Sequence, residues 1–204
     1  MKIICIGRNY INHAKELGNA VPKEPVFFLK PDTALLLKKQ PFFIPDFSNE
    51  IHYETELVVK IDRLGKNIQQ KFASKYYSEI GLGLDFTARD IQQECKSAGL
   101  PWEKAKAFDG SALMSQKLMP VSELNFEDGI NFNLLINGEQ KQIGNSKEML
   151  FSIDAIIAYV SIYFTLKIGD LIFTGTPEGV GKINPGDELV GFIEQEEMFK
   201  VKIK

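Results

Sequence analysis

The segment that most constrains the fold is an alternating run of residues, IHYETELVVKI, at positions 51–61. Side chains of a β-strand point to alternate faces, so residues two apart lie on the same side of the sheet. One face of this run is mostly apolar, and the other carries His52, Glu54, Glu56, Val58 and Lys60. The alternation therefore predicts a strand that projects two carboxylates, those of Glu54 and Glu56, toward the same side.

Apolar runs of strand length recur along the chain between glycine, proline and asparagine. Asn137-Gly138 separates two such runs and predicts a β-hairpin with a type I′ turn. Helices are expected over residues 9–17, ending at Gly18-Asn19, from Thr87 to near Gly99, and from the capping residue Ser152 to about Thr165. Strands are expected at residues 2–6, 26–29, 51–61, 79–86 and 170–174. Residues 132–142 are expected to form strands on both sides of the hairpin turn, and residues 187–203 are expected to form two strands. The predicted fold is α+β, mainly β, in a single domain over residues 1–204.

The composition argues against several classes of protein. The net charge is −3 and no long basic run is present, so no nucleic-acid partner is expected. No apolar stretch approaches the about 20 residues that a membrane-spanning helix needs, so no membrane association is expected. Cys5 and Cys95 are far apart and form no CxxC motif, which favours a reducing, cytoplasmic location.

Glu54, Glu56 and Asp85 are candidate metal ligands. Two carboxylates that converge in a water-poor site repel each other, so a proton or a cation must neutralise them. Hard oxygen ligands of this kind suit Mg²⁺ or Mn²⁺. Alternating charge is also typical of the solvent-exposed face of a strand, and an aspartate after an apolar run is also typical of a turn. Spacing alone favours these two structural interpretations.

His13 and Glu16 are the candidate general base and its partner. They lie three residues apart in an expected helix, so their side chains meet. A carboxylate beside an imidazole raises its basicity and fixes its tautomer; the alternative is a surface pair without function. His52 is either a neighbour of the metal ligands or a residue at the rim of the site. In PWEKAKAF, Lys104 or Lys106 could stabilise an oxyanion, although most lysines are merely solvated.

The segment TGTPEGVGK, residues 174–182, has the glycine content of a phosphate-binding loop but not its spacing. Five residues instead of four separate Gly175 from Gly181, and Ile183 follows Lys182 where the motif requires serine or threonine. A loop this rich in glycine can still offer backbone N–H groups to a carboxylate.

The order of the motifs is more specific than any one of them. IGRNYINHAKELGN, FFLKP, IHYETELVV, GLDFTARDIQ, GLPWEKAKAFDGS and FTGTPEGVG follow one another from about residue 3 onward. In this order the chain resembles the fumarylacetoacetate hydrolase family, in particular its short, single-domain acylpyruvase and oxaloacetate-decarboxylase branch. The resemblance implies a mixed β-roll with peripheral helices, usually assembled as a homodimer.

The resemblance also implies roles for particular residues. The residues implied to bind Mg²⁺ or Mn²⁺ are Glu54, Glu56 and Asp85. The implied catalytic residues, a water-activating dyad and one lysine, are His13, Glu16 and Lys106. The implied substrate contacts are Arg89, Gln92, Lys30 and Thr176.

The implied activity is metal-dependent hydrolysis of a carbon–carbon bond in a 3-acylpyruvate or a related small 2-oxo acid. The same site could decarboxylate oxaloacetate, and isomerisation of an unsaturated 2-oxo diacid of the hydroxyheptadienedioate type is the alternative. A non-catalytic module that binds a metal and a 2-oxo acid is an alternative of another class, although binding alone needs no base. The substrate's far end is expected to depend on the loop at residues 17–25 and on the many phenylalanines.

Overall fold

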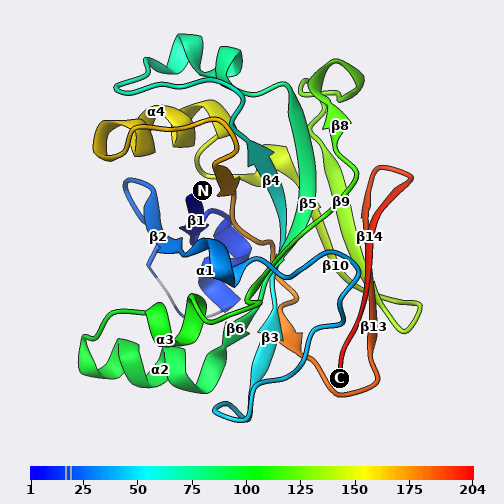
Figure 1. The fold of residues 1–204 in the computed structure, drawn as a ribbon. Coiled ribbons are helices and arrows are strands. Elements are labelled where there is room, and N and C mark those ends of the chain that lie inside the picture. Colours follow the sequence, from blue (N-terminus) through cyan, green and yellow to red (C-terminus); the bar gives the residue numbers. More distant parts are fainter. Residues whose placement is uncertain (17, 19) are drawn as a thin grey trace.

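The computed structural model describes residues 1–16, 18 and 20–204, and most of its regular structure lies in three β-sheets (Figure 1). The largest sheet has the strand order β2-β1-β11-β4-β5-β7, and β8 also pairs with β5. Its pairs are antiparallel except for β1 and β11, which are parallel. The strands of this sheet are β1 (Ile3–Gly7), β2 (Val26–Lys30), β4 (Thr55–Lys60), β5 (Glu79–Asp85), β7 (Ala112–Met114), β8 (Met119–Pro120) and β11 (Leu171–Phe173).

The two smaller sheets are antiparallel. The four-stranded sheet has the order β10-β9-β13-β14 and consists of β9 (Asn131–Ile136), β10 (Glu139–Asn145), β13 (Glu188–Ile193) and β14 (Glu196–Lys202). The three-stranded sheet has the order β12-β3-β6 and consists of β3 (Ile51–Tyr53), β6 (Thr87–Ala88) and β12 (Gly181–Lys182). Asn137 and Gly138, between β9 and β10, have φ angles of 53° and 82°. These positive angles confirm the predicted hairpin turn.

Helices lie at the periphery of the sheets (Figure 1). They are α1 (Ile11–Glu16), α2 (Arg89–Ala98), α3 (Glu103–Lys106) and α4 (Ile153–Tyr163), with 3₁₀ turns at Asp32–Ala34, Gln70–Tyr76, Val121–Glu123 and Ser146–Glu148. Ser152 Oγ accepts a hydrogen bond from the Ala155 N–H, as a capping residue does. In the described part of the chain, no helix has the length and apolar character to cross a membrane.

The two ends of α2 differ in their agreement with the sequence predictions. Thr87 was expected to cap a helix, but it lies in β6, and α2 begins after Ala88 without a side-chain cap. Gly99 ends α2 with a φ of 64°, as predicted. The expected helix stop at Gly18-Asn19 involves Asn19, which lies outside the described residues, as does part of the loop at 17–25.

Residues 51–61 form two strands instead of the single strand predicted. β3 pairs with β6 and β12, whereas β4 pairs with β5 and β11, and Glu54 lies between them. The chain therefore passes from one sheet to another at Glu54. Glu54, just before β4, and Glu56, within β4, are only 5% and 2% exposed, so other parts of the molecule cover the face on which they lie. This burial excludes the interpretation that Glu54 and Glu56 lie on the solvent-exposed face of a strand.

Among the described residues, the larger of two hydrophobic clusters extends across the sheets and includes buried residues from Ile4 to Ile203, and the smaller one includes Val58 and Phe173. β13 and β14 of the four-stranded sheet pack against β5 of the large sheet. Close packing explains Gly83 in β5: a Cβ there would lie 2.5 Å from the Leu113 carbonyl oxygen and 2.6 Å from the Phe173 ring. The strand that carries Asp85 is held tightly in place by these neighbours.

Candidate active site

Three carboxylates converge where the start of β4 meets the end of β5. The antiparallel pairing places Glu56 opposite Gly83, and the Asp85 N–H donates to the Glu54 carbonyl oxygen at 2.8 Å. One carboxylate oxygen from each of Glu54, Glu56 and Asp85 lies within 4.8 Å of the other two. The structure thus brings together the three residues that the sequence marked as candidate metal ligands. Asp85 is 1% exposed, so it is not a surface turn residue.

Lys106 lies at the centre of this cluster. Its Nζ donates to Glu54 Oε2 at 2.7 Å, Asp85 Oδ2 at 2.8 Å and Thr87 Oγ1 at 2.6 Å. Burial alone would lower the pKa of Lys106, but the charges of Asp85 and Glu54 outweigh it and raise that pKa. Lys104 is exposed on the same short helix. The lysine that reaches the site is therefore Lys106.

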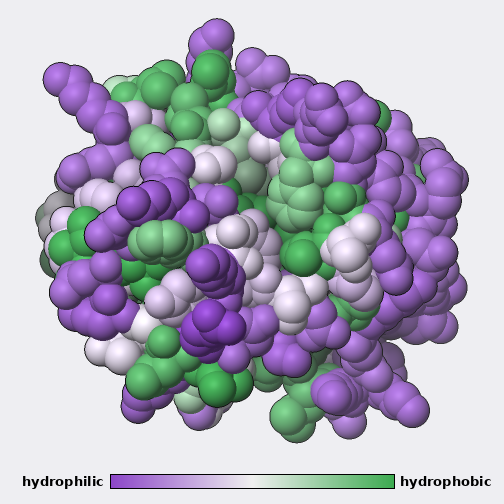
Figure 2. Space-filling view, turned by 90° about the horizontal axis from the view of Figure 1, so that it is seen from above, coloured by the Kyte–Doolittle hydropathy of each residue, from purple (hydrophilic) through white to green (hydrophobic). Residues whose placement is uncertain are grey.

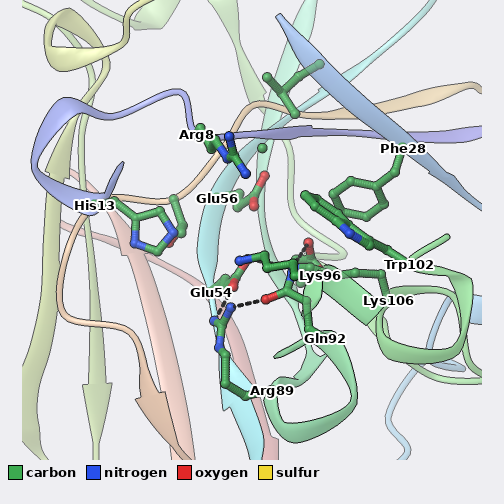
Figure 3. A pocket seen from close by; sticks show the side chains of 14 residues that line it. Arg8, His13, Phe28, Glu54, Glu56, Arg89, Gln92, Lys96, Trp102 and Lys106 are labelled. Atoms are coloured by element: carbon green, nitrogen blue, oxygen red, sulfur yellow. Dashed lines mark hydrogen bonds and ion pairs between the residues drawn. The ribbon is translucent and has the colours of Figure 1, made fainter. Parts of the chain in front are cut away.

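Arg89 and Gln92 lie on the face of α2 that borders the cluster (Figure 3). Arg89 Nη2 lies 2.5 Å from Glu54 Oε1, and its Nη1 donates to Gln92 Oε1 at 2.6 Å. His52 Nδ1 lies 3.5 Å from Arg89 Nε, so His52 contacts a partner of Glu54. Burial and the Arg89 charge lower the pKa of His52, which favours its neutral form.

Lys30 occupies a different position from the one implied by the resemblance. Its buried Nζ lies 2.7 Å from Asp85 Oδ1, donates to the Ser111 carbonyl and hydroxyl at 2.9 and 3.0 Å, and also donates to the Lys106 carbonyl. It does not line the cleft beside the carboxylates. Because its hydrogen-bonding capacity is used within the protein, Lys30 positions Asp85 and Lys106 and has no donor left for a substrate.

Glu54 and Glu56 differ in their electrostatic surroundings. Burial would raise the pKa of Glu54, but Lys106 and Arg89 outweigh it and hold that pKa well below its ordinary value. Burial, together with the charges of Asp85 and Glu54, raises the pKa of Glu56 well above its ordinary value. No ion pair among the described residues includes Glu56. The donor set and this unbalanced carboxylate fit a hard divalent cation.

The glycine-rich loop connects the carboxylates to the predicted dyad. His13 Nδ1 lies 3.1 Å from Glu16 Oε2, and the Gly179 N–H donates to the other oxygen of Glu16 at 3.1 Å. The Gly175 N–H donates to Glu56 Oε2 at 2.7 Å. The loop thus offers N–H groups to carboxylates of the protein itself.

One cleft contains most of the predicted site (Figure 3). The predicted residues that line it are His13, Glu54, Glu56, Asp85, Arg89, Gln92, Lys106 and Thr176. Arg8, Lys96 and Trp102 also line the cleft, and they are not among the site residues predicted from the sequence. A signal existed for Lys96, because it follows Gln92 by four residues on the same helix face. Arg8 has no such signal, because its direction depends on an unusual backbone angle.

A buried carboxylate cluster that could hold a divalent cation shares this cleft with Lys106 and with His13, whose partner Glu16 contacts the glycine-rich loop. Such an arrangement on a mainly β fold is typical of metal-dependent enzymes. Comparison with known proteins identifies the family to which the chain belongs. The family described as Fumarylacetoacetate (FAA) hydrolase C-terminal matches residues 2–201, and the chain belongs to this family.

Two relatives are similar to the chain over most of its length. Oxaloacetate tautomerase YcgM of Escherichia coli (strain K12) is 45% identical over 189 residues, which cover 92% of this chain and 86% of that protein. The mitochondrial oxaloacetate tautomerase FAHD1 of Mus musculus is 42% identical over 202 residues, covering 99% of this chain and 91% of that protein.

Solved structures show the same fold. A fumarylpyruvate hydrolase from Pseudomonas aeruginosa, in complex with Mn²⁺ and pyruvate, has a TM-score of 0.91 and 34% identity, covering 100% of this chain and 89% of that chain. A 5-carboxymethyl-2-hydroxymuconate delta-isomerase from Mycobacterium smegmatis has a TM-score of 0.86 and 31% identity, covering 99% and 78%. The expected family and mixed β fold are confirmed. Because these relatives are enzymes, the alternative of a non-catalytic binding module is disfavoured.

Proposed function

We propose that this protein is a divalent-metal-dependent enzyme that interconverts the keto and enol forms of oxaloacetate. The observation that carries the proposal is the position of His13, which is paired with Glu16, in the same cleft as the Glu54–Glu56–Asp85 cluster. The relatives named oxaloacetate tautomerase support the substrate, since those from Escherichia coli and mouse are 45% and 42% identical over nearly the whole chain.

In this proposal Glu54, Glu56 and Asp85 hold Mg²⁺ or Mn²⁺. The burial of the three carboxylates and the absence of a cationic partner for Glu56 within the described ranges support it. The Mn²⁺ in the fumarylpyruvate hydrolase structure supports it as well. When bound, the cation would supply Lewis-acid polarisation of the carbonyl oxygen of a 2-oxo acid.

The chain's own residues would bind the substrate and move the proton. Arg89 and Gln92 offer donors to the substrate's first carboxylate. Glu16 engages His13 through Nδ1, which leaves Nε2 for the substrate. His13 would remove a proton from C3 of the keto form while the C2 oxygen takes up a proton from water, and the reverse steps restore the ketone. The three donors of the Lys106 ammonium go to Glu54, Asp85 and Thr87, so Lys106 would act through its charge, which stabilises the negative charge that develops on the C2 oxygen.

Hydrolysis of a carbon–carbon bond in a 3-acylpyruvate is the second candidate function. The same His13–Glu16 pair can activate a water molecule, and the fumarylpyruvate hydrolase with 34% identity supports this reaction. Decarboxylation of oxaloacetate and isomerisation of an unsaturated 2-oxo diacid also pass through an enol-type species. These reactions therefore differ in the group that attacks the substrate or leaves it, and assays with different substrates can distinguish the reactions.

The test is a substrate panel with Mg²⁺, Mn²⁺ or a chelator. Tautomerisation is followed as loss of enol-oxaloacetate absorbance, decarboxylation as pyruvate formed, and hydrolysis with acetylpyruvate and fumarylpyruvate. We expect the largest acceleration for tautomerisation, with loss on chelation and in His13→Ala. No acceleration of tautomerisation with either metal would contradict the proposal, and faster hydrolysis would make the second candidate the main activity.

We also propose that residues 1–204 act as one catalytic domain that assembles into a homodimer in the cytoplasm. The family match over residues 2–201 supports the single domain, and the two unpaired cysteines support a reducing compartment. Exposed apolar side chains support a contact between copies: Ile162, Tyr163 and Ile168 are solvent-exposed, and Figure 2 shows apolar patches among hydrophilic residues. Sedimentation velocity should give twice the mass of one chain, and a monomer mass would contradict the dimer.

A further inference from the structure

We propose that Arg8 and Lys96 form a subsite for the second carboxylate of a four-carbon 2-oxo diacid. The inference rests on the proposed function, because it assigns the far end of oxaloacetate to the same cleft. Both residues line this cleft, and Figure 3 shows their side chains extending from different elements toward the space beside Glu54 and Glu56. The subsite would make the enzyme select dicarboxylates over 2-oxo acids with a neutral tail.

Arg8 is aimed into the cleft by an unusual backbone conformation. It directly follows β1 and has a φ of 59°, in the left-handed region that residues with a side chain rarely adopt. The next residue holds this turn in place. Asn9 is fully buried, its Nδ2 donates to the carbonyl oxygens of Phe151 at 3.1 Å and Thr174 at 2.8 Å, and its Oδ1 accepts from the Phe151 N–H at 2.8 Å. A strained angle that the surroundings maintain is typical of a functional position.

Lys96 approaches the same space from α2. It follows Arg89 and Gln92 on one face of the helix, and its Nζ lies 5.6 Å from the centre of the Trp102 ring. Trp102 is itself packed edge-on against Phe28, with ring centres 6.1 Å apart. The aromatic contact restrains the lysine side chain. Burial and the charges of Arg89 and Arg8 lower the pKa of Lys96, as expected for an ammonium in a positive field.

The charge balance of the cleft leaves these two cations available to a ligand. Lys30, Lys106 and Arg89 each form an ion pair with Asp85 or Glu54. In contrast, neither Arg8 nor Lys96 takes part in an ion pair within the described part of the chain. A guanidinium and an ammonium that line the same cleft suit a carboxylate, through charge-assisted hydrogen bonds. A substrate with a neutral tail would leave both cations without a partner.

Kinetics with paired substrates provide the first test. Arg8→Met and Lys96→Met should each raise KM for oxaloacetate by about tenfold or more, the usual cost of one hydrogen bond to a charged group. Turnover of the 4-methyl ester of oxaloacetate, which lacks the second charge, should fall much less than turnover of oxaloacetate. Lys104→Met is the matched control, because it removes an exposed lysine that does not line the cleft. Equal losses on the diacid and the ester would overturn the subsite.

Binding measurements separate the subsite from the reaction. Isothermal calorimetry with the Mn²⁺-loaded protein would compare malate with lactate, which lacks the second carboxylate. We expect tighter binding of malate by the wild type, loss of the preference in Arg8→Met and Lys96→Met, and its partial return in Arg8→Lys. No preference in the wild type would overturn the subsite, whether or not oxaloacetate is turned over. A preference without tautomerase activity would support the subsite and contradict the proposed reaction.

Discussion

Glu56 is the residue on which the proposed metal site depends most. Glu54 and Asp85 are both neutralised by cations, through Lys106, Arg89 and Lys30. Glu56 accepts a hydrogen bond from the Gly175 N–H but forms no ion pair within the described residues. Burial and the neighbouring carboxylates raise its pKa. Removing the charge of Glu56 therefore has a different consequence from removing that of Glu54.

We predict that Glu56→Gln leaves the metal-free protein as stable as the wild type or more so, because the amide oxygen can still accept from Gly175. Its affinity for Mn²⁺ should fall by more than about a hundredfold, since even residues behind a ligand affect affinity by about 10–100-fold. Glu54→Gln is the contrasting variant. It breaks a buried ion pair and should cost about 3–5 kcal/mol of unfolding free energy. Urea unfolding with a chelator and calorimetry with Mn²⁺ measure both effects, and equal destabilisation by the two variants would contradict the distinction.

At the scale of elements, β10 connects the four-stranded sheet to the site. Gln142 lies at a register shift of β10, is buried, and accepts from the Thr55 N–H at 3.0 Å. Its Nε2 donates to Thr176 Oγ1 at 2.9 Å and to the Pro177 carbonyl at 3.0 Å. One side chain thus connects the backbone between Glu54 and Glu56 to the glycine-rich loop.

We predict that Gln142→Ala lowers the unfolding free energy by about 1–3 kcal/mol, because the buried Thr55 N–H loses its acceptor. It should also lower kcat, because the loop that holds Glu16 and Glu56 loses an anchor. Gln140→Ala, at an exposed position of the same strand, is the control and should change stability by less than about 0.5 kcal/mol. The measurements are urea unfolding and steady-state kinetics. Identical behaviour of the two variants would show that Gln142 does not position the loop.

The parallel pair β1–β11 is secured by Asp170, which precedes β11. The Lys2 N–H donates to Oδ1 and the Lys167 N–H to Oδ2, each at 2.8 Å, and the Lys2 ammonium lies 2.5 Å from Oδ2. Burial alone would raise the pKa of Asp170, but these donors outweigh it and lower that pKa. A carboxylate with a lowered folded-state pKa stabilises the fold above its unfolded pKa of about 3.9. This stabilisation is lost as the pH falls through the folded-state pKa.

We therefore predict that Asp170→Asn is less stable than the wild type at pH 7. The difference should shrink as the pH falls below about 4, because the Asp170 carboxyl of the unfolded wild type takes up a proton there while the folded one stays charged to lower pH. Urea unfolding at a series of pH values measures the difference, and a difference that is constant from pH 7 to pH 3 would count against the ion pair as its cause.

At the scale of the whole molecule, metal binding and folding are coupled. The carboxylate cluster exists only when β4, β5 and α3 have assembled, so a cation that binds there favours the folded state. At 100 times its dissociation constant, Mn²⁺ should add about 2.7 kcal/mol to the unfolding free energy. Thermal unfolding with Mn²⁺ and with a chelator measures the gain. The same gain in Glu56→Gln would place the metal elsewhere.

Local patterns determined much of this protein from the sequence alone. The Asn137-Gly138 turn, the Ser152 cap and the Gly99 helix end depend on neighbouring residues, and the structure agrees with all three. The order of motifs likewise indicated the family and the candidate site residues. These features were readable because turn and cap conformations are set by side chains a few positions apart.

Only the tertiary structure decided whether the carboxylates form a site. The alternating run 51–61 is typical of one strand with a solvent-exposed face. It forms two strands divided at Glu54, because its two halves pair with different strands that are distant in sequence. The same holds for Lys30, which lies against Asp85 and not against the cleft, and for Arg8, whose direction depends on Asn9 and the segments it contacts. Burial and ion pairing are properties of long-range contacts. They show that Glu54 and Glu56, whose spacing alone favours a solvent-exposed face, lie in a buried cluster with Asp85.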